Sequence, residues 1–275
     1  MQKCSGMTDV AIGHMVPALC GLRTLRLGWC FRVTAKAIAS LAALTRLHTL
    51  ELAHTKLDDA TLAILASSLP RLKDLNLRGC AISDRGLTRC TPLARLEVLC
   101  LRTCEIGNAA VEALIAMPRL TELDLAYTEL SDPGLAAMAP LTKLQSLSLD
   151  SCRLSAGALH GLARFPRLRT LDLSDVEAPR FTVEALTALP HLTSLNLFYV
   201  GIGDHEVIHL TKLTNLAELN LDSRFISDAA MPALAAIPSL TRLDLFGSRT
   251  QAARASFPRA ACDQSHASHS PSHPH

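Results

Sequence analysis

Cysteine, histidine and acidic side chains are the groups in this sequence that could carry out covalent or acid–base chemistry. A cysteine would act as a catalytic nucleophile only if a histidine base and an acidic side chain converged on it in one pocket. The densest group is Asp204-His205-Glu206 with His209, and its position is typical of a helix start on a convex surface, where such residues cap the helix and face solvent. Neither the phosphate-binding GxxxxGK[ST] motif nor the GxSxG motif occurs. We therefore predict that the protein is not an enzyme.

Metal binding is the second chemistry that the residue types allow. Residues 251–275 are rich in Ala, Ser, Pro and His, and they contain His266, His269, His273 and His275. Such a segment buries too little apolar surface to offset the entropy of ordering it. We expect a flexible, solvated tail that chelates metal weakly at most, and the sequence implies no cofactor and no metal site.

The nine cysteines include no CxxC pair, which argues against a zinc ribbon and against a secreted disulfide framework. Five of them share one position in an internal repeat: Cys4, Cys30, Cys80, Cys104 and Cys152. Thr55 and Thr128 occupy the same position in other units. This exchange predicts small, buried groups that bond the turn backbone of the next unit. Because Val176, Val200 and Arg224 break the row, we expect different turns in units seven to nine, with the largest interruption at residues 178–180.

The repeat places leucines at a nearly constant spacing of 24 or 25 residues. They are Leu22, Leu47, Leu72, Leu96, Leu120, Leu144, Leu168, Leu192, Leu216 and Leu240. Each unit begins with an LxxLxL pattern, as at Leu120, Leu123 and Leu125. Alternating leucines predict a short strand, and the regular period predicts a stacked repeat fold.

The second half of each unit has the pattern of a short helix. It starts with Ser, Thr or Asp next to Asp, as at Ser83-Asp84 and Ser131-Asp132, and continues with apolar residues three apart. A short polar side chain there accepts the free amide hydrogens of the first turn, and the acid suits the helix dipole. A proline ends the helix in several units: Pro118, Pro166, Pro190 and Pro238.

The pattern LxxLxLxx(C/T)xLSDxGLxxLxxLP, seen near residues 120–140, resembles the leucine-rich repeat family. It is most similar to the cysteine-containing, ribonuclease-inhibitor-like subtype found in F-box proteins, and the resemblance covers about residues 4–249. It implies an α/β solenoid with a concave parallel β-sheet and short convex helices, which binds proteins. Ten strands about 4.8 Å apart would make a sheet face about 45 to 50 Å long.

The repeat also sets the expected domain organisation. We predict one leucine-rich-repeat domain over residues 1–250, with about ten strand-bearing units, followed by the tail at 251–275. Residues 4–19 have the pattern of the helix half of a unit, with Thr8-Asp9 at its start. The chain would then open in the middle of a unit, which favours a fragment, a missing N-terminal module or a partner that covers the first unit.

Composition narrows the partner class. The formal net charge is only +2, with 27 basic and 25 acidic side chains, so a basic stripe for nucleic acid is not expected. No apolar run has the length of a membrane span, and the N-terminal residues lack the apolar stretch of a signal peptide. We expect a cytoplasmic protein, with the nucleus and the cytoskeleton as alternatives, that is monomeric apart from a protein partner.

The strand positions between the leucines should face the concave side and contact that partner. Arginines lie in the early units and acids dominate the later ones, so the face should be dipolar; the simpler alternative is that these positions are polar only for solubility. Aromatic residues near the strand ends add interface anchors, or else they pack onto neighbouring units. The predicted partner-binding residues are Arg26, Arg78, Arg102, Glu122, Asp124, Asp150, Asp172, Phe198, Tyr199, Asp222 and Phe246.

Three functions remain open from the sequence. The leading hypothesis is a non-enzymatic scaffold that recognises a protein partner through the concave face. The first alternative is the substrate-recognition component of an SCF-type ubiquitin ligase, which needs an F-box from another segment or chain. The second is a structural component of a cytoskeletal or ciliary assembly.

Overall fold

The computed structural model describes residues 6–176, 183–221 and 225–245. Ten three-residue strands form one parallel sheet in which each strand pairs only with its neighbours in sequence. The strands are β1 (Thr24–Arg26), β2 (Thr49–Glu51), β3 (Asp74–Asn76), β4 (Val98–Cys100), β5 (Glu122–Asp124), β6 (Ser146–Ser148), β7 (Thr170–Asp172), β8 (Ser194–Asn196), β9 (Glu218–Asn220) and β10 (Arg242–Asp244). This arrangement confirms the predicted solenoid.

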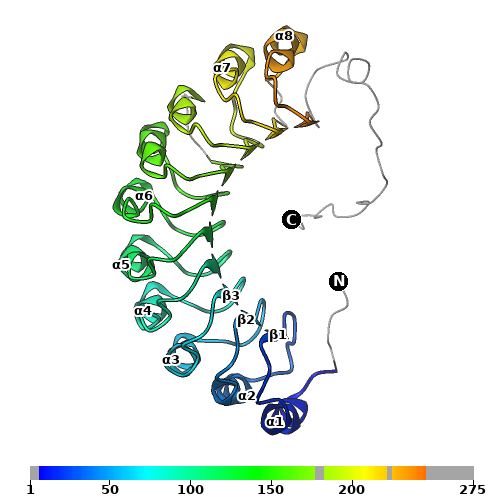
Figure 1. Ribbon diagram of the computed structural model, residues 1–275, viewed down its shortest axis with the longest axis vertical. Coiled ribbons are helices and arrows are strands. Elements are labelled where there is room, and N and C mark those ends of the chain that lie inside the picture. The colour runs from blue at the N-terminus through cyan, green and yellow to red at the C-terminus, as the bar shows by residue number, and fades with distance from the viewer. Residues whose placement is uncertain (1–5, 177–182, 222–224, 246–275) are drawn as a thin grey trace, which may run out of the picture.

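Short helices connect consecutive strands and lie on the outside of the arc, with the sheet on the inside (Figure 1). The α-helices are α1 (Asp9–Ala18), α2 (Ala35–Ser40), α3 (Asp59–Ser68), α4 (Asp84–Thr88), α5 (Val111–Ile115), α6 (Asp132–Ala137), α7 (Asp204–Leu210) and α8 (Met231–Ala235). The 3₁₀ segments are η1 (Leu41–Ala43), η2 (Asn108–Ala110), η3 (Ala156–Arg164), η4 (Val183–Ala188) and η5 (Asp228–Ala230). Within the described ranges, no helix has the length and apolar character needed to cross a membrane.

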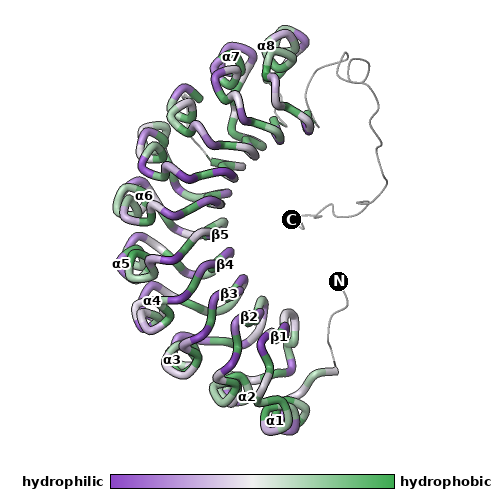
Figure 2. The backbone as a smooth tube through the Cα atoms, in the orientation of Figure 1, coloured by the Kyte–Doolittle hydropathy of each residue, from purple (hydrophilic) through white to green (hydrophobic). Residues whose placement is uncertain are grey.

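The core lies between the sheet and the helices and is built almost entirely from aliphatic side chains. The middle residue of each strand from β2 to β9 is a leucine with at most 2% of its surface exposed. Polar and apolar stretches alternate within each unit along the whole arc (Figure 2). Each unit covers the apolar face of the next, so the core continues from unit to unit.

A residue with positive φ follows the strand in most units. These residues are Trp29, His54, Gly79, Thr103, Tyr127, Ser151, Asp175 and Tyr199, and we call them the left-handed row. The N–H of Trp29 donates to the Ala53 carbonyl at 2.7 Å, and the N–H of Asp175 donates to the Phe198 carbonyl at 2.8 Å. The row therefore turns the chain away from the sheet while keeping one inter-unit hydrogen bond per turn.

The cysteine position is structural, as predicted, but its hydrogen bonds run backwards along the chain. The thiols of Cys80, Cys104 and Cys152 are buried. They donate to backbone carbonyls of the preceding unit at 3.1 to 3.2 Å, not of the next one. Burial raises the pKa of Cys104 to about 12 and that of Cys152 to about 11. These thiols therefore stay protonated and link adjacent turns by hydrogen bonds.

Directly after the strand, units seven and eight do not differ from the other units as expected. Val176 and Val200 are buried where the cysteines lie in other units. Asp175 and Tyr199 before them keep the left-handed backbone of the row. The turn depends on this backbone geometry, and a valine fills the same buried slot without a thiol hydrogen bond. Arg224 and residues 178–180 lie outside the described residues.

Two of the serines at the helix starts act differently from the prediction, whereas Ser227 accepts the N–H of Ala229 in its own 3₁₀ segment, as expected. The side chains of Ser83 and Ser131 make no cap hydrogen bond to their own helices. Instead, the Ser83 N–H and hydroxyl both donate to the carboxylate of Asp59, at the start of the preceding helix α3. Ser83 and Ser131 have an extended backbone, so their N–H groups make no bond within their own helices. Each N–H donates instead to a side-chain oxygen at the start of the preceding helical segment, Asp59 or Asn108. Similar links, which we call aspartate clamps, join Asp9 to Thr34, Asp132 to Ser155 and Asp204 to Ser227.

Candidate partner-binding face

The strand register places the predicted rows side by side on the inner face of the arc. The central row contains the last residue of every strand: Arg26, Glu51, Asn76, Cys100, Asp124, Ser148, Asp172, Asn196, Asn220 and Asp244. The first strand residues form a second row, which includes Glu122. The residues two positions after each strand form a third row, which includes Arg78, Arg102, Asp150 and Phe198.

Backbone hydrogen bonds hold the central row in place. The side-chain oxygens of Asp124 and Asp172 accept the N–H groups of Ala126 and Ser174, each at 3.0 Å. Asn76 and Asn196 accept in the same way at 3.0 and 3.1 Å. Such a bond satisfies a strand end that has left the sheet and fixes the side chain. The row therefore presents polar groups in settled orientations.

The second carboxylate oxygen of each acid points to the preceding unit. Cys100 donates its thiol to Asp124 Oδ2, and the hydroxyl of Ser148 donates to Asp172 Oδ2, both at 3.4 Å. The distance is long for the hydroxyl of Ser148, and the thiol of Cys100 is a weak donor, so both outer oxygens remain available to a stronger donor such as a cation.

Arg102 and Asp150 do not lie in separate basic and acidic zones, as the dipolar pattern implied. Arg102 Nη2 lies 2.7 Å from Asp150 Oδ2, and its guanidinium lies 4.7 Å from the centre of the Tyr127 ring. Asp150 is only 6% exposed. The unit between them carries Ala126 at the same position, so the arginine can reach across it. We call this pair the β4–β6 clamp.

Burial is the main influence on Asp150. It raises the pKa of this carboxyl, and hydrogen bonds from Ser151 and the charge of Arg102 oppose the increase. Ser151 Oγ lies 2.8 Å from Asp150 Oδ1 and 3.3 Å from Asp175 Oδ2. The clamp thus neutralises Asp150 and removes it from the acids that a partner can contact.

The remaining predicted charges are more accessible. Glu122 and Arg78 are exposed, and Arg26 is exposed with its Nε 3.6 Å from Glu51 Oε2. Over β5 to β7, Glu122, Asp124, Asp172 and Asp175 stay without a described ion pair, and we call these four residues the acidic patch. The acids of the central units therefore lie on the concave face, except that Asp150 is paired with Arg102 and Asp175 joins the group; their role in partner binding stays a prediction. Asp222 lies outside the described residues.

Exposed aromatic rings follow the edge of the same face. Tyr127 and Tyr199 are 50% and 56% exposed, and both belong to the left-handed row. Phe198 is half-buried and packs edge to face on Tyr199, with ring centres 4.2 Å apart. Phe246 lies outside the described residues. The aromatic positions fit the prediction, and whether they bind a partner remains a prediction.

Trp29 packs against the second unit. Its ring stacks on His54 of the second unit, with centres 3.9 Å apart. Gly79 lies beneath His54, where a Cβ would fall 2.3 Å from the His54 Nδ1 atom. These three residues therefore pack against one another along the left-handed row.

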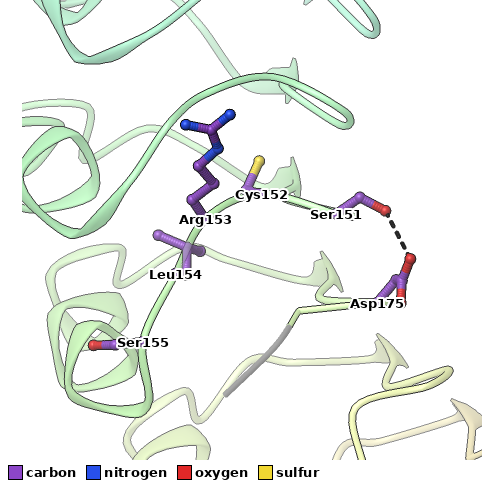
Figure 3. A pocket seen from close by; sticks show the side chains of 6 residues that line it. All are labelled: Ser151, Cys152, Arg153, Leu154, Ser155 and Asp175. Carbon is purple, nitrogen blue, oxygen red and sulfur yellow. Dashed lines mark hydrogen bonds between the residues drawn. The ribbon is translucent and has the colours of Figure 1, made fainter. Parts of the chain in front are cut away.

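Two hollows lie near the face. One, of about 180 Å³, lies over β8 to β10 between Asn196, Glu218 and Arg242. The other, of about 490 Å³, lies at the turns of units six and seven and is lined by Ser151, Cys152, Arg153, Leu154, Ser155 and Asp175 (Figure 3). The thiol of Cys152 donates a hydrogen bond to the Leu125 carbonyl, and the hydroxyl of Ser155 donates one to the carboxylate of Asp132. The potential nucleophiles of this hollow therefore serve the fold.

The sequence interpretation overlooked one motif. His205, Glu206 and His209 have the HExxH spacing that zinc proteases place on a helix. In the structure Glu206 Oε2 accepts the N–H of Gly203 at 2.8 Å and closes the cap of α7. No group of three or more metal-binding side chains occurs in the described part of the chain. The motif here is a helix start, which agrees with the interpretation of these residues as cap residues.

Comparison with known proteins supports the fold. No curated protein matches the chain in sequence. Among solved structures, internalin InlF of Listeria monocytogenes is 22% identical, with a TM-score of 0.60 over 82% of this chain and 68% of that chain. Internalin C2 of the same organism is 23% identical, with a TM-score of 0.49 over 86% and 83% of the two chains. At such identities the likeness concerns the fold alone.

The family comparison covers most of the units described above. Residues 5–211 match the family model described as the leucine-rich repeat region. This stretch contains β1 to β8 and the helices between them. The chain belongs to the leucine-rich repeat family.

Proposed function

We propose that this protein is a non-enzymatic scaffold that holds a protein partner against its concave face. The acidic patch would contact positive groups of that partner, and Tyr127 and Tyr199 would provide apolar anchors at the edge. The observation that carries the proposal is the fixation of Asp124 and Asp172 by backbone N–H groups beside exposed rings. Leucine-rich repeats generally serve as protein-binding scaffolds, and this supports the class of function.

The geometry favours recognition because little has to be ordered on binding. Side chains that are already fixed lose little conformational entropy when a partner arrives. Large rings at an interface contribute more binding free energy than most residues. Charges of one sign on the central strands orient the approaching partner. The face therefore combines orientation with anchoring, and no covalent step is needed.

The test is affinity purification from the native source with the full chain as bait. The test variant is Asp124→Asn with Asp172→Asn, because Asn76, Asn196 and Asn220 already occupy this row. Asparagine keeps the oxygen that accepts the backbone N–H and removes the charge. Asp150 is left unchanged because it is held by Arg102. The control is Glu112→Gln with Glu184→Gln, which removes two exposed charges from helical segments.

We expect the test variant to lose at least tenfold of the captured partner, while the control variant keeps it. Two buried or half-buried charge contacts of about 0.7 kcal/mol each would suffice for such a change. Equal capture by the wild-type chain and the test variant would exclude the acidic patch as the partner site.

The ubiquitin-ligase alternative rests only on the resemblance of the cysteine row to the subtype found in F-box proteins, since the family match itself is to the leucine-rich repeat region. In that case the concave face would bind a substrate, and an F-box would come from another segment or chain. The same purification separates the candidates: ligase subunits would support this alternative, and axonemal or cytoskeletal proteins would support a structural role.

A further inference from the structure

The charge of the chain is divided unevenly between the arc and the segment that follows it. Residues 246–275 contain three arginines, Arg249, Arg254 and Arg259, and one acid, Asp263. The chain has 27 basic and 25 acidic side chains, so residues 1–245 have 24 of each. The formal net charge of +2 therefore resides in the segment after β10, before any histidine is protonated.

The concave face has the opposite local imbalance. The acidic patch places four carboxylates on the two units that flank β6: Glu122 and Asp124 on β5, and Asp172 and Asp175 at and just after β7. Asp150 of the unit between them is already neutralised by Arg102. The arginines of the outer strands are engaged elsewhere: Arg26 Nε lies 3.6 Å from Glu51 Oε2, and Arg242 Nη1 lies 3.7 Å from Glu218 Oε1. The two pairs of carboxylates are two strand spacings, about 10 Å, apart, so carboxylates of like charge face one another within each unit and, more weakly, across β6. A basic segment laid across β5 to β7 would relieve this repulsion.

The segment after β10 can reach the acidic patch. From β10 to β7 is three strand spacings, about 14 Å, and from β10 to β5 is five, about 24 Å. Arg254 is ten residues beyond Asp244, and ten extended residues span up to about 33 Å. The hollow over β8 to β10 lies on this path along the inner face. A short connection of this kind gives the attached segment a local concentration of about 1 mM or more.

The segment also carries a ring that suits the edge of the face. Phe257 lies between Arg254 and Arg259 in sequence. Tyr199 and Tyr127 are exposed three units apart on the left-handed row. A segment with two arginines around a phenylalanine matches a surface with carboxylates beside exposed rings in both charge and polarity.

We propose that residues 246–263 bind in cis to the acidic patch on β5 to β7 and compete there with other basic ligands. The proposal concerns the same face as the proposed function, but it requires no external partner. It makes the arc self-occupied until a tighter ligand displaces the segment.

The test uses a labelled synthetic peptide of residues 246–263 and the full chain in three forms. They are the wild-type chain, a tail variant with Arg249→Ser, Arg254→Ser and Arg259→Ser, and the same tail variant with Asp124→Asn and Asp172→Asn added. Fluorescence anisotropy at low salt measures peptide binding to each form. A scrambled peptide of the same composition controls for sequence-independent charge attraction.

The peptide should bind the tail variant about tenfold more tightly than the wild-type chain, because the attached segment occupies the patch in the wild type. Adding the two aspartate changes should abolish most of this binding, and raised salt should weaken it. Equal binding to the wild-type chain and the tail variant would overturn cis occupancy. Equal binding with and without the aspartate changes would overturn the location.

A second measurement follows the attached segment itself. Trypsin cuts after Arg254, and mass spectrometry gives the rate of this cut in the full chain at low salt. Docking should slow the cut several-fold relative to a chain with Asp124→Asn and Asp172→Asn alone. Equal rates would contradict the proposal. Partner capture that depends on Asp124 and Asp172 but is unaffected by the tail changes would leave the proposed function standing while this inference fails.

Discussion

At the residue scale, two glycines with positive φ differ in what surrounds them. Gly79 has φ +65° and lies under the His54 ring, whereas Gly201 has φ +76° and no atom within 4 Å of an added Cβ. Any other residue at either position pays the cost of a left-handed backbone. Only at Gly79 does an added methyl group also collide with a stacked ring pair, His54 on Trp29.

We therefore predict that Gly79→Ala lowers the free energy of unfolding by about 2 to 3 kcal/mol, and that Gly201→Ala lowers it by about 1 kcal/mol. Urea denaturation measures both. The fluorescence of Trp29 in the folded state should change only in Gly79→Ala, because His54 must move. Equal losses for the two variants would show that the His54 contact contributes nothing.

Glu206 provides a second test at this scale, because its motif and its structure suggest different roles. As the closing residue of the α7 cap, Glu206→Ala should cost about 1 kcal/mol of unfolding free energy. If His205 and His209 instead bound zinc, the metal would stabilise the folded state, and the free energy of unfolding would rise with zinc concentration. We predict that added zinc shifts the urea midpoint equally in the wild-type chain and in His205→Ala with His209→Ala. A shift that requires both histidines would refute the cap-only interpretation.

The repeat was enough to predict which residues lie on the concave face, but it did not predict which of them pair with one another. The period assigns Asp124 and Asp172 to one row because every unit has the same length. The β4–β6 clamp joins residues 48 positions apart, and only the sequence Arg102, Ala126, Asp150 at equivalent positions could have indicated it. A small residue between opposite charges in successive units is the signal that such a clamp is sterically allowed.

At the element scale, the aspartate clamps connect one helix start to the next unit. The N–H and hydroxyl of Thr34 donate to Asp9 at 2.8 and 2.7 Å. These bonds lower the pKa of Asp9, with the backbone bond as the larger cause. A carboxyl whose pKa is lower in the folded state stabilises the fold above its unfolded pKa, and this contribution is lost as the pH falls through the folded pKa.

The expected outcome for Thr34→Ala is a rise in the pKa of Asp9 toward its ordinary value of 3.8. The rise should be partial, since the backbone N–H still donates. A carboxyl-detected NMR titration measures it, and the acid-induced loss of stability should begin at a higher pH in the variant. Asp58, whose pKa is lowered by Thr61 within its own helix, serves as the internal control and should not change. An unchanged Asp9 would mean that the hydroxyl bond is absent in solution.

The strands could be predicted more fully than the helix starts. Alternating leucines placed each strand on the face and register where the structure has it. The serines of Ser83-Asp84 and Ser131-Asp132 were given to their own helices because capping is the local explanation. In the structure Ser83 donates its hydrogen bonds to Asp59 of the preceding unit, which comes close only when units stack. Lateral bonds of this kind depend on the separation between units, which a single unit's pattern does not contain.

At the scale of the whole molecule, the arc is covered unevenly from end to end. The middle leucine is 8% exposed in β1 and at most 2% exposed in β2 to β9, while Leu243 in β10 is only half-buried. In a stacked array, each unit is stabilised mainly by its nearest neighbours, so an end unit has lost one of two contacts. We predict that backbone amides of β10 exchange hydrogen fastest, those of β1 next, and those of β4 to β6 slowest.

Hydrogen-exchange mass spectrometry on the full chain measures this gradient. The comparison of β1 with β5 is the informative one, because the same leucine pattern occurs in both and only their neighbours differ. Uniform protection from β1 to β10 would contradict nearest-neighbour stabilisation and would indicate that the arc opens in a single step.

The β4–β6 clamp has a mechanical consequence. Most bonds of the array join one unit to the next, so pulling on the two ends would peel units away singly. Arg102 and Asp150 are held 2.7 Å apart across an intervening unit, so the fifth unit cannot leave without stretching this pair. Under force, units four to six would yield as one block, and the middle of the arc would behave as a stiff segment between two compliant arms.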